Sequence, residues 1–240
     1  MLHKTRGIVL KNTNYSENSV IVQIFTEKFG IQSYLINGVK KPKAKIKNNI
    51  LQPLHLLEMV VYHKQASNLQ RVAEAGQLPL LQTIPYDITK SSIALFLNEV
   101  VYKCIRHQGP DEALFEFIFR SIELLDSLQK NLNIFHLHFL LRLTQYLGFY
   151  PELINRNYPF FDLKEGCFVN SIPAHRLFLQ TPDTSYFLEL LTSNYTEALK
   201  TPLQGFEKKY LLERILEYYQ LHVDGFGEIR SHRILEEVLQ

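Results

Sequence analysis

The sequence of 240 residues predicts an α+β fold of two domains. A small five-stranded β-barrel is expected over residues 1–80, and a larger all-α domain over residues 81–240. Apolar residues form short strand-like runs up to Gly76 and then recur at helical spacing. The charge divides at the same place: residues 1–80 carry 11 Lys/Arg against 4 Asp/Glu, whereas residues 81–240 carry 15 against 20. This asymmetry indicates an anion-binding module joined to one with a different role.

The N-terminal region is expected to form five short strands rich in β-branched residues. Gly30 suits the positive φ of the turn before the third strand. A long loop separates the third strand from the fourth. This pattern is typical of a small closed barrel such as an OB-fold, although composition alone does not separate it from another small barrel. The predicted strands are residues 7–10, 19–25, 31–39, 54–62 and 69–75.

The C-terminal region is expected to form six amphipathic helices. Gly109-Pro110 separates the first two, and Gly148 stops the third. The helical pattern is interrupted by two apolar runs around Lys164-Glu165-Gly166, which predict a small β-hairpin insertion at about residues 158–170. The predicted helices are residues 87–107, 113–128, 133–147, 182–191, 205–221 and 231–239.

The composition is that of a folded protein, because 46% of the residues are hydrophobic and 12% aromatic. No apolar run approaches the roughly 20 residues needed to span a bilayer, and the N-terminus has no secretory apolar core. Cys104 and Cys167 are the only cysteines, so a disulfide framework is not indicated. We therefore expect a cytoplasmic protein with no membrane association.

Motifs of catalysis are absent. The sequence has no GxxxxGKS or GxxxxGKT phosphate-binding loop, no GxGxxG, no HExxH and no cysteine pair at zinc-ligand spacing. His136 and His138 point about 200° apart on their predicted helix, which prevents them from sharing a metal. We therefore expect no enzymatic activity, no catalytic residue, no cofactor and no metal.

The clearest chemical signal is the run KKPKAKIK at residues 40–47, which holds five lysines and no acid. Lysines along a flexible segment can follow a phosphodiester backbone without reading bases. If about five phosphates of a single strand are neutralised, log K falls with log salt at a slope of roughly −3.5. Barrel aromatics offer stacking faces, although at least half of them are expected to fill the core. These aromatics are Tyr15, Phe25, Phe29 and Tyr34.

Five short motifs follow one another in the N-terminal region: GIVL at 7–10, YSENS at 15–19, FTEKFG at 25–30, GVKKPK at 38–43 and LQP at 51–53. In this order they resemble the N-terminal signature of the RecO family of bacterial recombination mediators and DNA-repair proteins. The resemblance continues more weakly through NE at 98–99, LGFYP at 147–151, HVDG at 222–225 and RS at 230–231.

The resemblance implies an N-terminal OB-fold and a C-terminal helical domain in a cytoplasmic, nucleoid-associated protein. It implies binding of single- and double-stranded DNA, annealing of complementary strands and partnership with RecR. It also implies docking on the C-terminal tail of single-stranded-DNA-binding protein, so that RecA is loaded onto coated strands. No catalytic residue is implied, because base pairing supplies the free energy of annealing.

Carried over residue by residue, the resemblance implies a basic face on the barrel, for which ordinary solvated surface is the alternative. This nucleic-acid-binding set comprises Arg6, Lys11, Lys40, Lys41, Lys43, Lys45, Lys47 and Arg71. The family's tail-binding site implies an apolar pocket with a cation at its rim near helix 133–147. His138 and Arg142 are the expected rim groups, and Leu137 and Leu141 the expected walls, although a leucine stripe is also typical of a core.

One departure concerns zinc. Many relatives carry four cysteines across the region that is residues 154–170 here, where only Cys167 is present. Asn155, Asn157 and Asp162 make poor companions for a structural zinc site. We predict no metal and a hairpin packed by its own apolar residues, namely Phe160, Phe161, Leu163 and Phe168.

Two other functions stay open. A generic OB-fold protein for RNA or tRNA, or for assembly, would favour structured RNA over DNA through its 2′-hydroxyl groups. A metal-dependent nuclease needs a carboxylate or histidine cluster. No such cluster is visible in the sequence, although residues distant along the chain can converge in space.

Overall fold

The computed structural model describes residues 1–65, 67–106 and 108–239, apart from the side chain of Glu236. The chain forms two compact units, Met1–Ser127 and Leu128–Gln240. The last barrel strand ends close to the boundary predicted at residue 80, but the first two helices belong to the same compact unit as the barrel. Within the described ranges, no helix is long and apolar enough to cross a membrane.

The first unit begins with a closed barrel of five strands in the order β1-β2-β3-β5-β4. The pairs are antiparallel except for β3 and β5, which run parallel. This topology confirms the predicted α+β fold class with its N-terminal barrel. The strands are β1 (Leu2–Ser16), β2 (Ser19–Thr26), β3 (Gly30–Asn37), β4 (Leu56–Tyr62) and β5 (Gln70–Gln77).

The barrel interior is filled by side chains from alternate strand positions, including Val22, Tyr34 and Met59, as a small barrel requires. Gly7 is needed there, because a Cβ at this position would lie 2.7 Å from both Ile24 Cγ2 and Met59 Cε. A side chain at residue 7 would therefore have to displace Ile24 and Met59 within the packed interior.

Two helices, α1 (Ile88–Cys104) and α2 (Glu112–Ser127), bury part of the outer barrel wall. The Asn98 amide donates to the Leu10 carbonyl at 2.9 Å, and the Phe25 and Phe115 rings lie 5.6 Å apart. The turn between the helices meets Gly30, whose φ is +65°, and a Cβ there would lie 2.4 Å from the Gly109 carbonyl carbon. The helical pair is thus part of the barrel unit.

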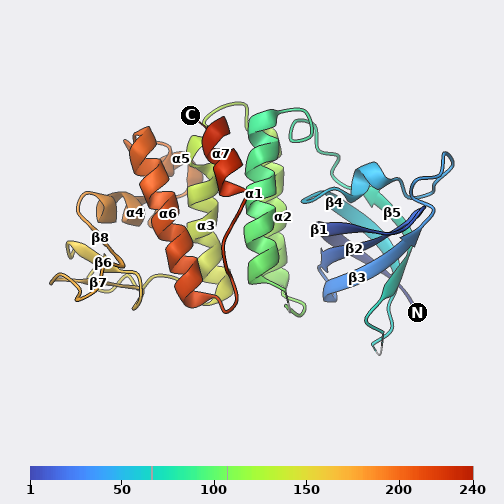
Figure 1. The fold of residues 1–240 in the computed structure, drawn as a ribbon, viewed down its shortest axis with the longest axis horizontal. Coiled ribbons are helices and arrows are strands. Elements are labelled where there is room, and N and C mark those ends of the chain that lie inside the picture. Colours follow the sequence, from blue (N-terminus) through green and yellow to red (C-terminus); the bar gives the residue numbers. More distant parts are fainter. Residues whose placement is uncertain (66, 107, 240) are drawn as a thin grey trace. The chain divides into compact units, whose positions relative to one another are not determined.

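The second unit consists of helices with a small sheet of order β7-β6-β8 at one edge, next to α4, and α3 and α6 lie side by side (Figure 1). The predicted hairpin is present as β6 and β7, whereas β8 and the short α5 were not predicted. The helices are α3 (Phe135–Leu147), α4 (Asp183–Thr192), α5 (Tyr195–Ala198), α6 (Gly205–His222) and α7 (His232–Val238). The strands are β6 (Phe160–Asp162), β7 (Cys167–Val169) and β8 (Phe178–Gln180).

Candidate nucleic-acid interface

The basic segment, residues 38–47, runs from β3 to a 3₁₀ turn, η1 (Asn48–Leu51). Val39, Ile46 and Leu51 are buried in the barrel core and anchor the segment at both ends. Backbone hydrogen bonds from Lys41 N to Gly38 O at 3.1 Å and from Ala44 N to Lys41 O at 3.0 Å form turns within it. The segment therefore holds its charges on a folded scaffold and is not the freely flexible loop that the sequence suggested.

The lysines of the basic segment all point to solvent. Lys40, Lys41, Lys43, Lys45 and Lys47 are exposed, and no acid among the described residues forms an ion pair with any of them. Five positive charges on eight consecutive residues are thus left uncompensated by the barrel. Such a charge density attracts a polyanion by releasing the counterions condensed on it.

Two further predicted cations lie on barrel strands and are also exposed. Lys11 is on β1, and the next residue, Asn12, donates its side-chain amide to Asn48 Oδ1 at 3.0 Å and to Leu51 O at 3.1 Å. Lys11 is therefore one residue from the contact between β1 and the end of the basic segment. Arg71 is on β5, opposite Leu35 of β3.

Arg6 differs from the other predicted cations in having two acidic partners. Its Nη2 lies 2.8 Å from Glu27 Oε1 and 2.9 Å from Glu116 Oε2, and its Nε lies 3.1 Å from Glu27 Oε2. Its guanidinium carbon lies 5.2 Å from the Phe115 ring centroid and 4.9 Å from that of Phe119. The guanidinium is paired with two carboxylates and stacked on two rings, so Arg6 joins α2 to the barrel, and its contact with nucleic acid stays a prediction.

The pKa values of Arg6, Glu27 and Glu116 are shifted in the directions that their mutual hydrogen bonds favour. Hydrogen bonding to Glu27 raises the pKa of Arg6, and hydrogen bonding from Arg6 lowers the pKa of Glu27. Partial burial opposes ionisation of Glu116, but hydrogen bonds from Arg120 and Arg6 outweigh it and lower its pKa. All three groups are therefore charged at neutral pH.

The four barrel aromatics divide between the core and the surface. Phe25 and Tyr34 are fully buried and cannot stack on a base. Phe29 is half-buried and stacks on the His63 ring, with centroids 4.0 Å apart. Tyr15, near the tip of the β1–β2 hairpin, is 63% exposed. Of these four, Tyr15 is the one that offers an open ring to a ligand.

The predicted tail-binding residues do not form a pocket. Leu137 and Leu141 are fully buried, so they fill the helical core and cannot wall a surface site. His138 Nε2 lies 3.1 Å from the Ser193 carbonyl, and burial lowers the pKa of His138, which makes it a neutral ring and not a cation. Arg142 alone keeps the expected rim charge.

A groove of about 260 Å³ lies elsewhere along α3, where the helix meets the start of α6 and the end of α7. Its lining is largely apolar and includes Phe206, whose side chain is 74% exposed. Lys208 and Lys209 contribute cations. Because these residues are distant from α3 in the sequence, helical spacing alone did not reveal the groove. Its other lining residues are Asn133, His136, Gly205, Leu212, Leu235 and Leu239.

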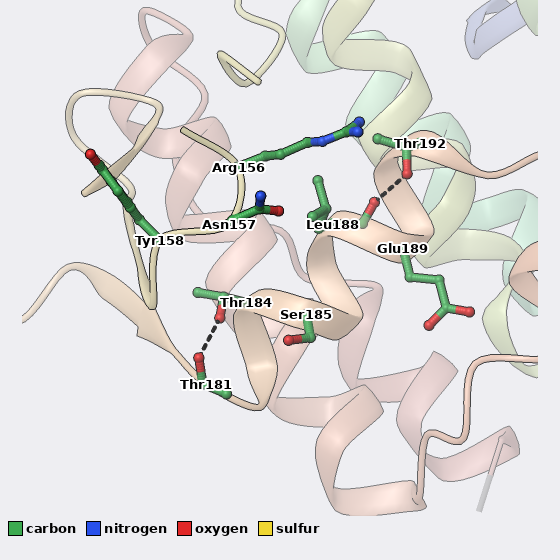
Figure 2. Close-up of a pocket in the computed structure, with 9 residues that line it drawn as sticks. All are labelled: Arg156, Asn157, Tyr158, Thr181, Thr184, Ser185, Leu188, Glu189 and Thr192. Carbon is green, nitrogen blue, oxygen red and sulfur yellow. Dashed lines mark hydrogen bonds between the residues drawn. The ribbon is translucent and has the colours of Figure 1, made fainter. Parts of the chain in front are cut away.

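A larger cleft of about 520 Å³ lies between residues 156–158 and α4 (Figure 2). Hydroxyl groups of α4 and of the preceding residues line it, and the Thr181 and Thr184 hydroxyls are 3.2 Å apart. Arg156 and Glu189 bring one charge of each sign. The cleft therefore has no excess of cations that would attract a phosphate backbone.

The region for which the sequence predicts no metal, around residues 154–170, is held together by contacts of Asp162 and by apolar packing. The Asp162 carboxylate accepts the backbone N–H groups of Lys164 and Glu165 at 2.8 and 3.2 Å and lies 3.2 Å from His175 Nε2. Phe161, Leu163 and Phe168 are buried and Phe160 half-buried, as predicted for the hairpin. In the described part of the chain, no three His, Cys, Asp or Glu side chains gather as metal ligands. The absence of zinc stays a prediction.

Comparison with known proteins connects this architecture to a family. Residues 1–78 match the family model described as recombination protein O N terminal, and residues 85–228 match the recombination protein O C terminal model. The DNA repair protein RecO of Azobacteroides pseudotrichonymphae is 39% identical over 242 residues, with 99% of both chains covered. Proteins of the same name from Phocaeicola vulgatus and Flavobacterium psychrophilum are 36% and 34% identical, with 99% and 98% of each chain covered. The chain therefore belongs to the recombination protein O family of DNA repair proteins.

Proposed function

We propose that this protein is a recombination mediator that binds single- and double-stranded DNA through the basic segment and turns over no substrate. In this role it anneals complementary strands and, together with RecR, helps to load RecA onto strands coated by single-stranded-DNA-binding protein. Such a ligand would bring the protein to the nucleoid. The observation that carries the proposal is the row of five exposed, unpaired lysines on a closed barrel of this family.

The lysines suit strand annealing because they contact phosphates and not bases. A strand held by its backbone keeps its base edges free, so a complementary strand can pair with it. Lys11 and Arg71 add charge outside the segment, whereas the charge of Arg6 is paired with two acids. Uniform, salt-sensitive binding across DNA sequences is therefore expected.

The first test measures binding of a fluorescent single-stranded oligonucleotide across a salt series. Changing all five lysines of the basic segment to Gln should make the slope of log K against log salt shallower by roughly 3.5, because about five phosphate contacts are lost. A control with Lys130, Lys164 and Lys200 changed to Gln removes exposed charges from the second unit and should keep the wild-type slope. Absence of binding by the folded wild type would refute the proposal. Displacement by structured RNA in preference to DNA would favour an RNA-binding protein.

We also propose that the groove beside Phe206 receives the tail of single-stranded-DNA-binding protein. A peptide that ends in acidic residues, an aromatic side chain and a free carboxylate matches an apolar groove with two lysines. Changing Lys208 and Lys209 to Gln should weaken the binding of a fluorescent peptide of this kind at least tenfold, because one or two charge-assisted hydrogen bonds are lost. Arg142→Gln is the matched control for the position predicted from the sequence. Loss of peptide binding in Arg142→Gln, with wild-type binding in the Lys208 and Lys209 double variant, would refute the groove as the binding site of the tail.

A further inference from the structure

A pair of cations gathers around one aromatic ring beside the C-terminal end of α1. Lys11 Nζ lies 5.5 Å from the centroid of the Tyr102 ring, and the Arg106 guanidinium carbon lies 6.0 Å from the same centroid. Both distances are within the range of a cation–π attraction. Lys11 comes from β1 and the other two residues from α1 or just beyond it, so the fold and not the local sequence brings them together.

Neither cation is compensated by an acid. Lys11 and Arg106 are exposed, and neither forms an ion pair with any acid that the structure describes. Glu99, one turn before Tyr102, lies 3.7 Å from Lys103 Nζ. The partial negative charge at a helix C-terminus accounts for a cation at Arg106. It does not explain why Lys11, on a barrel strand, meets the same ring.

Both neighbours of Lys11 in β1 form hydrogen bonds to other elements of the barrel unit. The Asn98 amide bonds the carbonyl of Leu10, which fixes α1 against β1 next to Lys11. On the other side of Lys11, Asn12 holds Asn48 and Leu51 in the turn that follows Lys47. These contacts lie within one compact unit and connect the basic segment, β1 and the end of α1.

We propose that Lys11 and Arg106, positioned by Tyr102, form a second phosphate-binding contact that carries the nucleic-acid track from the barrel onto α1. The ligand is the phosphodiester backbone of the strand held by the basic segment, so this inference rests on the proposed function. The ring limits the freedom of two long side chains before the ligand arrives, which reduces the entropy that binding must remove. Lys11 is among the residues predicted for the basic face of the barrel, whereas Tyr102 and Arg106 have no role predicted from the sequence.

The test is the salt dependence of binding to a fluorescent oligothymidine. Changing Lys11 and Arg106 together to Gln should make the slope shallower by about 1.4, because two single-strand phosphate contacts are lost. Tyr102→Leu should weaken binding about 2- to 5-fold at fixed salt, and Tyr102→Phe, which keeps the ring, should bind as the wild type does. Lys103→Gln is the matched control on the same helix, because this lysine is paired with Glu99, and its slope should not change.

The outcomes separate this inference from the function on which it rests. A wild-type slope in the Lys11 and Arg106 double variant, together with a shallower slope in the five-lysine variant, would refute the contact on α1 alone. Wild-type slopes in both variants would also refute the basic segment as a DNA-binding site. Far-UV circular dichroism and thermal melting of each variant establish that it is folded. Because Tyr102→Phe keeps the ring and removes only the hydroxyl, wild-type binding by this variant together with weaker binding by Tyr102→Leu would assign the role to the ring.

Discussion

The ion pairs of Arg6 allow its structural role to be tested against the role predicted from the sequence. Arg6→Gln removes two carboxylate partners and two ring contacts from the junction between β1 and α2. Partly exposed pairs contribute about 0.2–1 kcal/mol each, and a cation–π contact at an exposed site contributes about 0.5–1 kcal/mol. One guanidinium shares all these contacts, so the loss in free energy of unfolding should be about 2 kcal/mol.

Native-state hydrogen exchange with mass spectrometry measures this loss within the barrel unit. Peptides from β1 and α2 should exchange about 30-fold faster in Arg6→Gln, since 1.4 kcal/mol corresponds to a factor of ten. Lys4→Gln is the matched control on the same strand, because the Lys4–Glu58 pair is largely exposed and should contribute less than about 0.5 kcal/mol. Equal exchange in wild type and Arg6→Gln would refute the structural role.

Acid should reduce the difference in free energy of unfolding between the wild type and Arg6→Gln. The pKa values of Glu27 and Glu116 are lowered in the folded state from the ordinary 4.5, so the stability that they contribute is complete above that value. It is lost as the pH falls through their folded pKa values, while Arg6 stays charged throughout. A difference that persists unchanged at low pH would contradict the ion-pair origin of the effect.

The DNA-binding assay distinguishes a structural role of Arg6 from a contact of Arg6 with phosphate. If Arg6 holds α2 to the barrel, Arg6→Gln should keep the wild-type salt slope under conditions in which the variant is folded. If Arg6 instead contacts a phosphate, the slope should become shallower by about 0.7. The second result would restore the role that the sequence predicted.

Three further predictions concern other parts of the molecule. Asp126→Ala should lower the free energy of unfolding by about 2–3 kcal/mol in urea titration, because the Asp126 carboxylate accepts the N–H groups of Gln82, Thr83 and Ile84 at 2.8–2.9 Å; an unchanged midpoint would contradict this. Gly30→Ala should destabilise by at least about 1 kcal/mol, given the positive φ and the overlap with the helix turn, whereas Gly109→Ala, with open space around it, should cost less. Elemental analysis should find no stoichiometric zinc, and a chelator should leave the melting temperature unchanged; one zinc per chain would overturn the prediction drawn from the lone Cys167.

Short runs rich in β-branched residues were enough to predict the barrel, but not the length of its strands. β1 was predicted over residues 7–10 and extends over Leu2–Ser16. Leu2–Ile8 pairs with β4 and Gly7–Ser16 with β2, so the two pairings overlap only at Gly7 and Ile8. The residues of β1 on either side of 7–10 are mostly polar, so no apolar run marks them as strand. Backbone pairing to distant strands therefore determined a length that local composition did not indicate.

The site predictions differ in outcome because residue type does not reveal a distant partner. A run of lysines without neighbouring acids predicts exposure, and the basic segment is exposed. Arg6 looks equally basic in the sequence, yet its partner Glu116 is 110 residues away. Leu137 and Leu141 show the helical spacing of both a core and a pocket wall, and only burial separates the two.

Paired and unpaired cations therefore divide two tasks within the barrel unit. Arg6 is neutralised between Glu27 and Glu116, and it contributes to stability and not to the charge available to a ligand. The lysines of the basic segment, with Lys11 and Arg106, have no such acids and contribute little to stability. Removing a paired cation should therefore change unfolding with little change in salt slope, and removing an unpaired cation should do the reverse. The proposed phosphate track from the basic segment to Arg106 requires a constant distance between the barrel and α1. The hydrogen bond from Asn98 of α1 to the Leu10 carbonyl of β1 helps to keep that distance.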